Sequence, residues 1–211
     1  MTGSARRLPM FPLSTVLFPG AALPLHVFEE RYRVLTTRCL EGDREFGVVL
    51  IGRGPEVGGG DRRLDVGVVA RIDEASALPD GRFVLITTGT DRFCVTEWLP
   101  DDPHPLALVE VLGPSPGPGG DVAGALTAAA SSVRRSRALL SELGQGPALG
   151  HLELDGDPDA ASWRLCEAAP VGTLDRQHLL ETADLLERIL LVQEMADAMS
   201  EDLHRLLAEG G

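Results

Sequence analysis

The chain has 211 residues, a hydrophobic content of 44% and a formal net charge of −13. All 19 basic residues are arginines, and without lysine these residues can form no Walker A phosphate loop, Ser-Lys dyad or Schiff base. The acidic balance disfavours non-specific binding to nucleic acid or anionic lipid. No run approaches about 18 apolar residues and the start lacks a signal-peptide core, so we expect a cytoplasmic protein without a membrane span.

The three cysteines, Cys39, Cys94 and Cys166, are odd in number and far apart, and no CxxC motif occurs. A disulfide scaffold is therefore not expected. His151 and Glu153 resemble half of a metal site, but no second His or Cys stands at ligand spacing. The sequence also lacks an HExxH motif. We therefore predict no catalytic residue, no metal and no cofactor.

The early segment Leu8–Tyr32, LPMFPLSTVLFPGAALPLHVFEERY, combines four prolines with many apolar residues. Each proline fixes φ and removes a backbone donor, so neither a long helix nor a central strand can run through it. It is too apolar for a solvated linker. The segment predicts short extended pieces, broken at Phe18-Pro19-Gly20, that lie in a sheet and close against a helix. Apolar side chains left uncovered there would offer a docking site.

Residues 1–112 are expected to form a β-rich lobe. Apolar and β-branched runs predict strands over 8–13, 22–27, 46–51, 64–75, 82–88, 92–98 and 106–112. Gly89-Thr90-Asp91 predicts a hairpin between two of them, and 53–63 predicts a surface loop. About seven short strands with one early helix favour a partly closed barrel.

The early helix is predicted to begin at Glu29, because apolar residues recur from there at three- and four-residue steps. We expect Gly42 to end it. Its buried face is expected to contain Phe28, Tyr32, Leu35, Cys39 and Leu40.

Residues 113–120, GPSPGPGG, predict a Gly/Pro linker, because neither a helix nor a core strand tolerates this sequence. Residues 121–211 are then expected to form a helical lobe. Apolar periodicity predicts helices over 122–143, 159–169 and 174 to about 207, the last with Thr173 as its N-cap.

Several short motifs occur in a specific order: FPL, LFPG and LPLHVFEERYR within 11–33, GDREFGVV at 42–49, LPDGR at 78–82, GTDRF at 89–93 and APVG at 169–172. Together they resemble the N-terminal substrate-binding domain of the Lon protease family, over about residues 8–205. The resemblance implies an α+β fold, in which a PUA-like β pseudo-barrel with one helix precedes a C-terminal helical bundle. It also implies recognition of protein substrates. Full Lon proteases add ATPase and protease modules, and without lysine neither is expected here, so we expect a stand-alone, non-catalytic domain.

The candidate site lies in the proline-rich segment and the start of the helix. We predict that its apolar side chains bind unfolded or hydrophobic polypeptide or a partner protein, and that Glu29 and Arg31 shape this surface through charge-assisted hydrogen bonds. The predicted site residues are Phe11, Pro12, Leu13, Phe18, Pro19, Leu23, Pro24, Leu25, Glu29, Arg31 and Tyr32. The sequence leaves open which of the apolar members are core and which are exposed.

Two other classes of function remain open at this stage. One is a PUA-like nucleic-acid binder, which the acidic charge disfavours. The other is a small-molecule sensor or an assembly domain that forms homo-oligomers through the long last helix.

Overall fold

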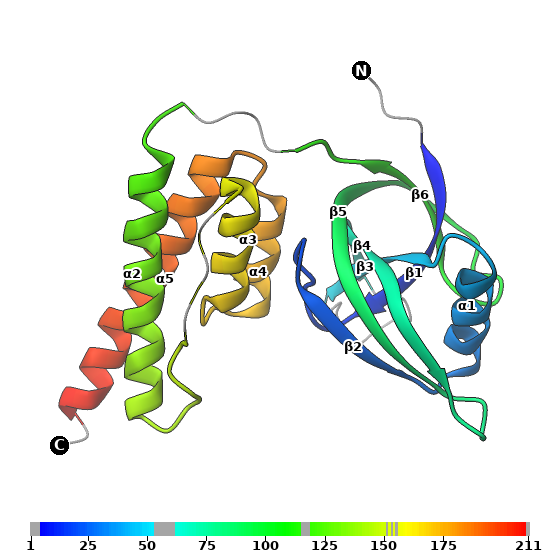
Figure 1. Ribbon diagram of the computed structural model, residues 1–211, viewed down its shortest axis with the longest axis horizontal. Coiled ribbons are helices and arrows are strands. Elements are labelled where there is room, and N and C mark those ends of the chain that lie inside the picture. Colours follow the sequence, from blue (N-terminus) through cyan, green and yellow to red (C-terminus); the bar gives the residue numbers. More distant parts are fainter. Residues whose placement is uncertain are drawn as a thin grey trace. The chain divides into compact units, whose positions relative to one another are not determined.

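The computed structural model describes residues 5–52, 62–114, 119–150, 152, 154 and 156–209. The chain divides into two compact units, Met1–Gly113 and Pro114–Gly211, of which the first is rich in strands and the second is helical (Figure 1). Most of the predicted 53–63 loop, the middle of the 113–120 linker, His151 and Glu153 lie outside the described residues. None of the described helices is both long and apolar enough to cross a membrane.

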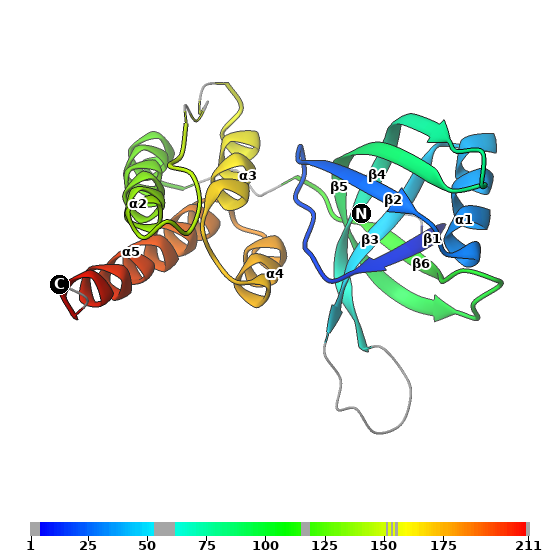
Figure 2. The ribbon, with the colours of Figure 1, turned by 90° about the horizontal axis from the view of Figure 1, so that it is seen from below.

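The β-rich unit is a pseudo-barrel. The strands of its described residues are β1 (Arg6–Leu13), β2 (Ala22–Val27), β3 (Glu45–Gly52), β4 (Arg62–Ala77), β5 (Phe83–Leu99) and β6 (Leu106–Val111). They follow the order β2-β5-β4-β3-β1-β6, and an additional pairing of β5 with β6 closes the sheet (Figure 2). β1 and β3 are parallel, whereas the other pairs are antiparallel. The predicted barrel class is confirmed.

The barrel interior is filled by fully buried apolar side chains, including Met10, Val69 and Phe93. The Phe93 ring fits because β4 carries Gly67 beside it, where a Cβ atom would lie only 2.7 Å from the ring. An interior packed to this density leaves no room for an added methyl group.

The hairpin predicted at Gly89-Thr90-Asp91 is wrong, because β5 runs continuously from Phe83 to Leu99. Instead of forming a turn, Gly89 allows the backbone of the 18–21 segment to approach β5 closely. The backbone N–H of Gly20 donates to the Gly89 carbonyl at 2.8 Å, and Gly89 donates back to the Ala21 carbonyl at 2.9 Å. The Phe18-Pro19-Gly20 turn therefore rests on the middle of β5, and the halves of β5 on either side pair with β2 and β6.

Helix α1 (Glu30–Glu41) lies beside the barrel in both ribbon views (Figures 1 and 2). It ends at Gly42 as predicted, and it buries Tyr32, Leu35 and Cys39. Phe28 was expected on the same face, and this is wrong: it precedes the helix and is 66% exposed. Helical periodicity does not apply to a residue that lies before the first turn.

The helical unit contains α2 (Val122–Glu142), α3 (Pro158–Ala168), α4 (Thr173–Glu181) and α5 (Leu185–Glu209). α2 and α5 pack side by side (Figure 1). The single helix predicted from Leu174 to about residue 207 is wrong, because the chain turns at 182–184. Asp184 stabilises the new start by accepting a hydrogen bond from the Glu187 N–H at 2.8 Å.

The expected N-cap at Thr173 is also wrong. Gly172 has the extended backbone of the N-cap position, and Thr173 is the first residue of α4. The broader prediction of a helical second half with a long last helix is confirmed.

Candidate functional site

An aromatic stack joins α1 to the barrel. The rings of Tyr32 and Phe11 stack with centroids 4.1 Å apart and an interplanar angle of 12°, and Phe11 meets Phe46 at 5.8 Å. Burial raises the pKa of the Tyr32 phenol, so the ring stays neutral at physiological pH. The stack therefore fixes the first turn of α1 against β1 and β3.

A charged pair covers the outer end of this stack. The Arg31 guanidinium carbon lies 4.6 Å from the centroid of the Tyr32 ring, and Arg31 Nε donates to Glu29 Oε2 at 3.0 Å. Both charged side chains are exposed. The pair thus orders the start of α1 and places two exposed charged side chains there.

The predicted site residues do not share one environment. Pro24, Glu29 and Arg31 are exposed, and Leu13, Pro19 and Leu23 are half-buried. The remaining five are buried: Phe11, Pro12, Phe18, Leu25 and Tyr32. A buried side chain can shape a binding surface but cannot touch a partner in the folded protein, so direct contact falls to the exposed and half-buried members.

Strand β2 has one inward and one outward face. Leu25 and Val27 are buried, whereas Ala22, Pro24 and His26 at the alternate positions are exposed. This alternation follows from the strand pleat. The outward residues continue into the exposed Phe28, which begins the connection to α1.

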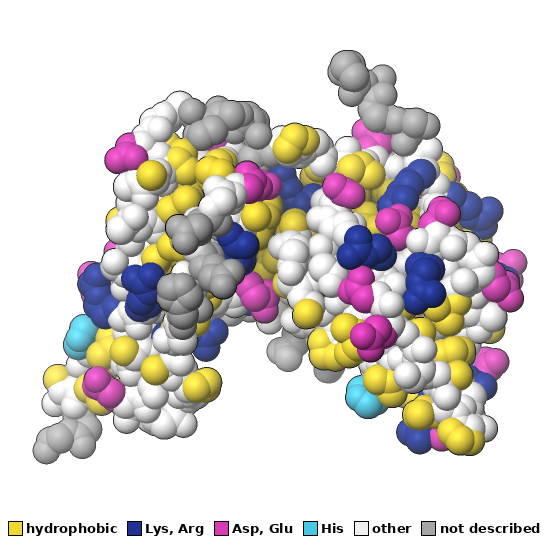
Figure 3. Space-filling model, in the orientation of Figure 1, with side chains coloured by type: hydrophobic (Ala, Val, Ile, Leu, Met, Phe, Trp, Pro, Cys, Tyr) yellow, Lys and Arg dark blue, Asp and Glu magenta, His cyan; other side chains and the backbone are white. Residues whose placement is uncertain are grey.

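Strand β5 extends this outward face. Pro24 pairs with Ile86 and His26 pairs with Val84, and Ile86 is 40% exposed. We refer to Pro24, His26, Phe28, Val84 and Ile86 as the β2 surface. Figure 3 shows hydrophobic side chains reaching the surface of the β-rich unit near a histidine, with charged groups around them.

Sequence reasoning missed Phe28, His26, Val84 and Ile86 as members of this surface. Alternation within 82–88 could have separated Ile86 from the buried Leu85. Its pairing with Pro24 depends on the register between β2 and β5, for which the sequence carries no local signal.

Among the strands that the structure describes, β2 pairs only with β5 and lies at the open edge of the sheet. The N–H of Gly89 donates to the Ala21 carbonyl, and hydrogen-bonded positions alternate in an antiparallel ladder. The backbone groups of Ala22, Pro24 and His26 therefore face the open edge. Because proline has no N–H, Pro24 presents only an acceptor there. Proline at this position limits pairing with another strand.

A hollow of about 350 Å³ lies beside α1. Val34 and Thr37 of α1 line it together with Phe83 at the start of β5. Arg33 closes one side by donating from Nε to the Gly81 carbonyl at 2.6 Å. The hollow is small and partly charged, and none of the predicted site residues lines it.

The described cysteines are poorly placed for chemistry. Cys39 is buried and donates to the Glu45 carbonyl at 3.2 Å, and burial raises the pKa of its thiol to about 12. A thiolate, the reactive form, is therefore disfavoured at this position. Within the part of the chain that the structure describes, no group of three or more His, Cys, Asp or Glu side chains could hold a metal ion.

The described residues thus form a pseudo-barrel with an exposed apolar surface at its edge strand, followed by a helical unit. The family described as "ATP-dependent protease La (LON) substrate-binding domain" matches residues 7–198. The chain therefore belongs to the LON substrate-binding domain family, as its motifs predicted.

Curated relatives and solved structures agree with this assignment. The chain is 27% identical over 185 residues to Lon protease 2 of Herpetosiphon aurantiacus, covering 86% of this chain and 22% of the relative. It is 28% identical over 198 residues to Lon protease 2 of Myxococcus xanthus, covering 93% and 24%. The chain thus spans about a quarter or less of the length of these relatives.

The crystal structure of a Lon N-terminal domain protein from Xanthomonas campestris has a TM-score of 0.62 and 28% identity, with 88% of this chain and 95% of that one covered. The N-terminal domain of the Mycobacterium avium complex Lon protease has a TM-score of 0.58 and 17% identity, with 90% and 98% covered. The second likeness supports the fold alone.

Proposed function

We propose that this chain recognises protein substrates or a partner protein by binding an apolar polypeptide segment on the β2 surface. The observation that carries the proposal is the exposure of Phe28, at 66%, beside an outward face that also carries Pro24 and Ile86. An exposed aromatic side chain within an apolar patch gains free energy when a partner covers it. Because burial is non-directional, such a surface accepts many apolar sequences.

Apolar contact with side chains is the main mode of binding in this proposal. Pro24 leaves Ala22 and His26 as the donors of β2 on its open edge. A polypeptide added as a further strand would therefore lose a main-chain hydrogen bond at the centre of β2. Pairing at the edge contributes orientation, and the apolar side chains contribute affinity.

We propose no catalytic step for these 211 residues. They contain no lysine, so a Walker A loop and a Ser-Lys dyad cannot be built from them. The named protease activity of the relatives belongs to proteins of which this chain covers 22% to 24%.

The proposal is tested by fluorescence anisotropy with a labelled extended peptide rich in Val, Leu and Phe. A second peptide with Asp at alternate positions serves as the comparison. Phe28→Ser and Ile86→Ser are expected to weaken binding of the first peptide by about tenfold or more, since each removes an exposed apolar contact.

Val111→Ser is the matched control, because Val111 of β6 is 44% exposed and Ile86 is 40% exposed. It should leave the dissociation constant unchanged. Wild-type affinity in folded Phe28→Ser and Ile86→Ser proteins would exclude the β2 surface. Tyr32→Asp is unsuitable as a test because it breaks the stack with Phe11 and confuses unfolding with loss of binding.

A further inference from the structure

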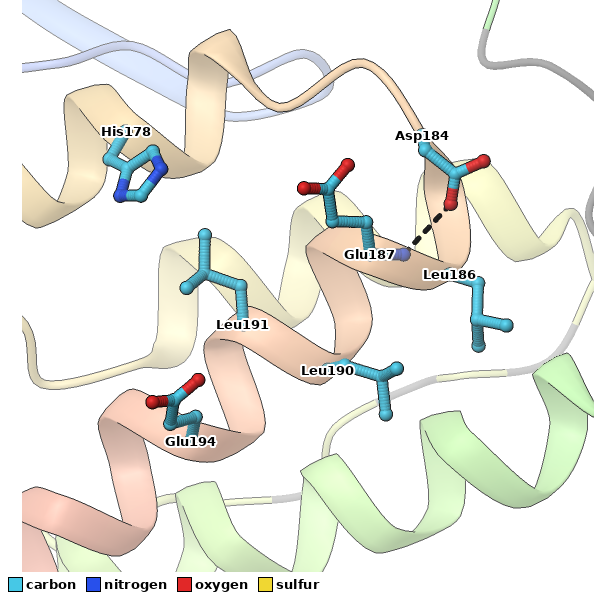
Figure 4. A pocket seen from close by; sticks show the side chains of 7 residues that line it. All are labelled: His178, Asp184, Leu186, Glu187, Leu190, Leu191 and Glu194. Carbon is cyan, nitrogen blue, oxygen red and sulfur yellow. Dashed lines mark hydrogen bonds between the residues drawn. The ribbon is translucent and has the colours of Figure 1, made fainter.

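The turn between α4 and α5 creates a groove in the helical unit. Its volume is about 420 Å³, and it lies between His178 of α4 and the 186–194 face of α5, with Asp184 at the corner (Figure 4). In a single continuous helix over 174–207, these residues would lie along one straight axis and form no hollow between two helices. The α4–α5 groove therefore exists because Asp184 restarts the helix.

The α5 side of the groove carries acidic and apolar residues in parallel rows. Glu187 and Glu194 are two turns apart, so they lie on the same line of the helix. Figure 4 shows Leu191 beside this line on the side turned toward α4, and Leu186 and Leu190 on the other flank. The carboxylates thus stand between two apolar flanks.

One leucine of α5 and one of α4 are largely exposed. Leu190 is 51% exposed and Leu174 is 74% exposed. Leu174 precedes His178 by one helical turn, so it lies on the same side of α4 as the groove-lining histidine. Leu190 lines the groove, and a large apolar side chain left exposed in a hollow indicates a surface that another molecule covers.

The carboxylates of the groove are available to a ligand. Within the described residues, neither Glu187 nor Glu194 forms an ion pair, and both are exposed. The sequence from Pro114 onward contains 7 arginines against 16 acidic residues, a net charge of −9. A positively charged ligand is therefore attracted both by the local pair and by the surrounding field.

We propose that the α4–α5 groove docks a cationic amphipathic helix of a partner protein. Its arginine or lysine side chains meet Glu187 and Glu194, and its apolar side chains cover Leu190 and Leu191. A symmetric dimer in which two such grooves face each other fits poorly, because it would bring like charges together. The groove belongs to the helical unit and the β2 surface to the β-rich unit. We assign a charged helix to the groove and uncharged apolar segments to the β2 surface.

The test uses the full chain and a labelled synthetic helix of about 15 residues that repeats Leu and Arg along one face. Fluorescence anisotropy measures its dissociation constant. Two comparison peptides replace either every Arg by Glu or every Leu by Ser. Both are expected to bind about tenfold or more weakly, and the affinity of the Leu/Arg helix should fall as salt rises from about 0.05 M to about 0.5 M.

Matched variants locate the binding. Leu190→Ser should weaken binding about tenfold, and Leu206→Ser should not, although Leu206 on the same helix is 55% exposed. The double variant Glu187→Gln/Glu194→Gln should weaken binding, whereas Glu142→Gln/Glu201→Gln, which changes the net charge equally at exposed positions, should not.

Three outcomes would overturn the proposal. The first is that the Leu/Arg helix fails to bind, or binds folded Leu190→Ser as tightly as wild type. The second is equal weakening by both glutamate double variants, which would mean general charge attraction without a site. The third is a dimer in sedimentation experiments that Leu190→Ser abolishes, which would assign the groove to self-association.

Discussion

The backbone of Gly89 in β5 lies directly against the carbonyl group of Phe18, in the turn that precedes β2. Gly20 and Gly89 are joined by a hydrogen bond of 2.8 Å, and Gly89 and Ala21 by one of 2.9 Å. A side chain at position 89 would collide with the turn. This contact holds the turn that leads into the edge strand β2 against the middle of β5.

Gly89→Ala is therefore expected to destabilise the protein by about 1–3 kcal/mol, because the added methyl group pushes the turn away from β5. Urea unfolding followed by circular dichroism measures this change. Gly113→Ala is the control, since nothing lies within 4 Å of a Cβ atom there, and it should change stability by less than about 0.5 kcal/mol. Equal stability of Gly89→Ala and wild type would contradict the packing of the turn on β5.

The stack of Tyr32 on Phe11 gives a second prediction. Tyr32→Ala should cost about 3–5 kcal/mol, because it leaves a cavity between α1 and the barrel. Tyr32→Phe keeps the stacked ring and should cost less than about 1 kcal/mol. Thermal unfolding distinguishes the two. If both variants lose the same stability, the hydroxyl group and not the stack would be the important feature.

In the helical unit, Arg188 of α5 is fully buried. The guanidinium carbon of Arg188 lies 3.6 Å from the centroid of the Trp163 ring, and the guanidinium forms an ion pair with Asp159. The same group donates a hydrogen bond of 2.8 Å from Nη2 to Ser162 Oγ and one of 3.2 Å to the Thr182 carbonyl. These partners come from α3 and from the α4–α5 connection. One side chain thus holds three parts of the unit together.

Arg188→Lys is expected to destabilise the helical unit by about 2–4 kcal/mol, although it keeps the charge, because an ammonium group can neither stack flat on Trp163 nor reach all the acceptors. Arg205→Lys is the matched control at an exposed pair with Asp202, and it should be neutral within about 0.5 kcal/mol. Thermal unfolding followed by the helical circular dichroism signal measures the stability change of both variants. If Arg188→Lys left the stability unchanged, the positive charge alone would be enough to hold these parts together.

Alkaline pH should destabilise the fold through its buried thiols. Burial raises the pKa of Cys39 and of Cys166 to about 12 in the folded chain, against an ordinary value of 9.0. The unfolded chain therefore loses these protons first, so the stabilisation is complete below pH 9 and is lost as the pH rises toward 12. Urea midpoints should fall over this range, and less steeply for Cys39→Ala/Cys166→Ala. An unchanged slope in that variant would contradict the effect.

Thiol labelling should distinguish the three cysteines. Cys94 is half-buried, whereas Cys39 and Cys166 are buried. A thiol reagent at neutral pH should modify Cys94 first and slowly, since burial together with Asp65 and Glu110 raises its pKa. Mass spectrometry after proteolysis identifies the site. Rapid modification of Cys39 or Cys166 in the folded protein would mean that those regions open readily.

The sequence predicted most elements correctly where the pattern was local. The prolines of Leu8–Tyr32 predicted short strands because they exclude a long helix and a central strand, and Gly42 predicted the end of α1. The two largest errors, at Gly89 and at 182–184, arose where one local signal has two structural meanings. A glycine permits either a turn or a close approach, and a Thr-Ala-Asp sequence is compatible with both a continuous helix and a restart.

The candidate site was predicted only in part, for the same reason. Pro24 is exposed and its neighbour Leu25 is buried, as the alternation of side chains along a strand requires. The contribution of Ile86 required knowing that β5 lies beside β2, and the exposure of Phe28 required knowing where α1 begins. The first depends on a contact between segments that are distant in the sequence, and the second depends on the position of a helix start.

By itself, the sequence determined the acidic charge, the absence of lysine chemistry, the kinds of secondary structure and the family, because composition and local motifs carry these directly. Only the tertiary structure decided which side of β2 is open, and that a groove separates α4 from α5. The physical reason is that exposure is a property of packing: a side chain is buried or free according to what the rest of the chain places against it.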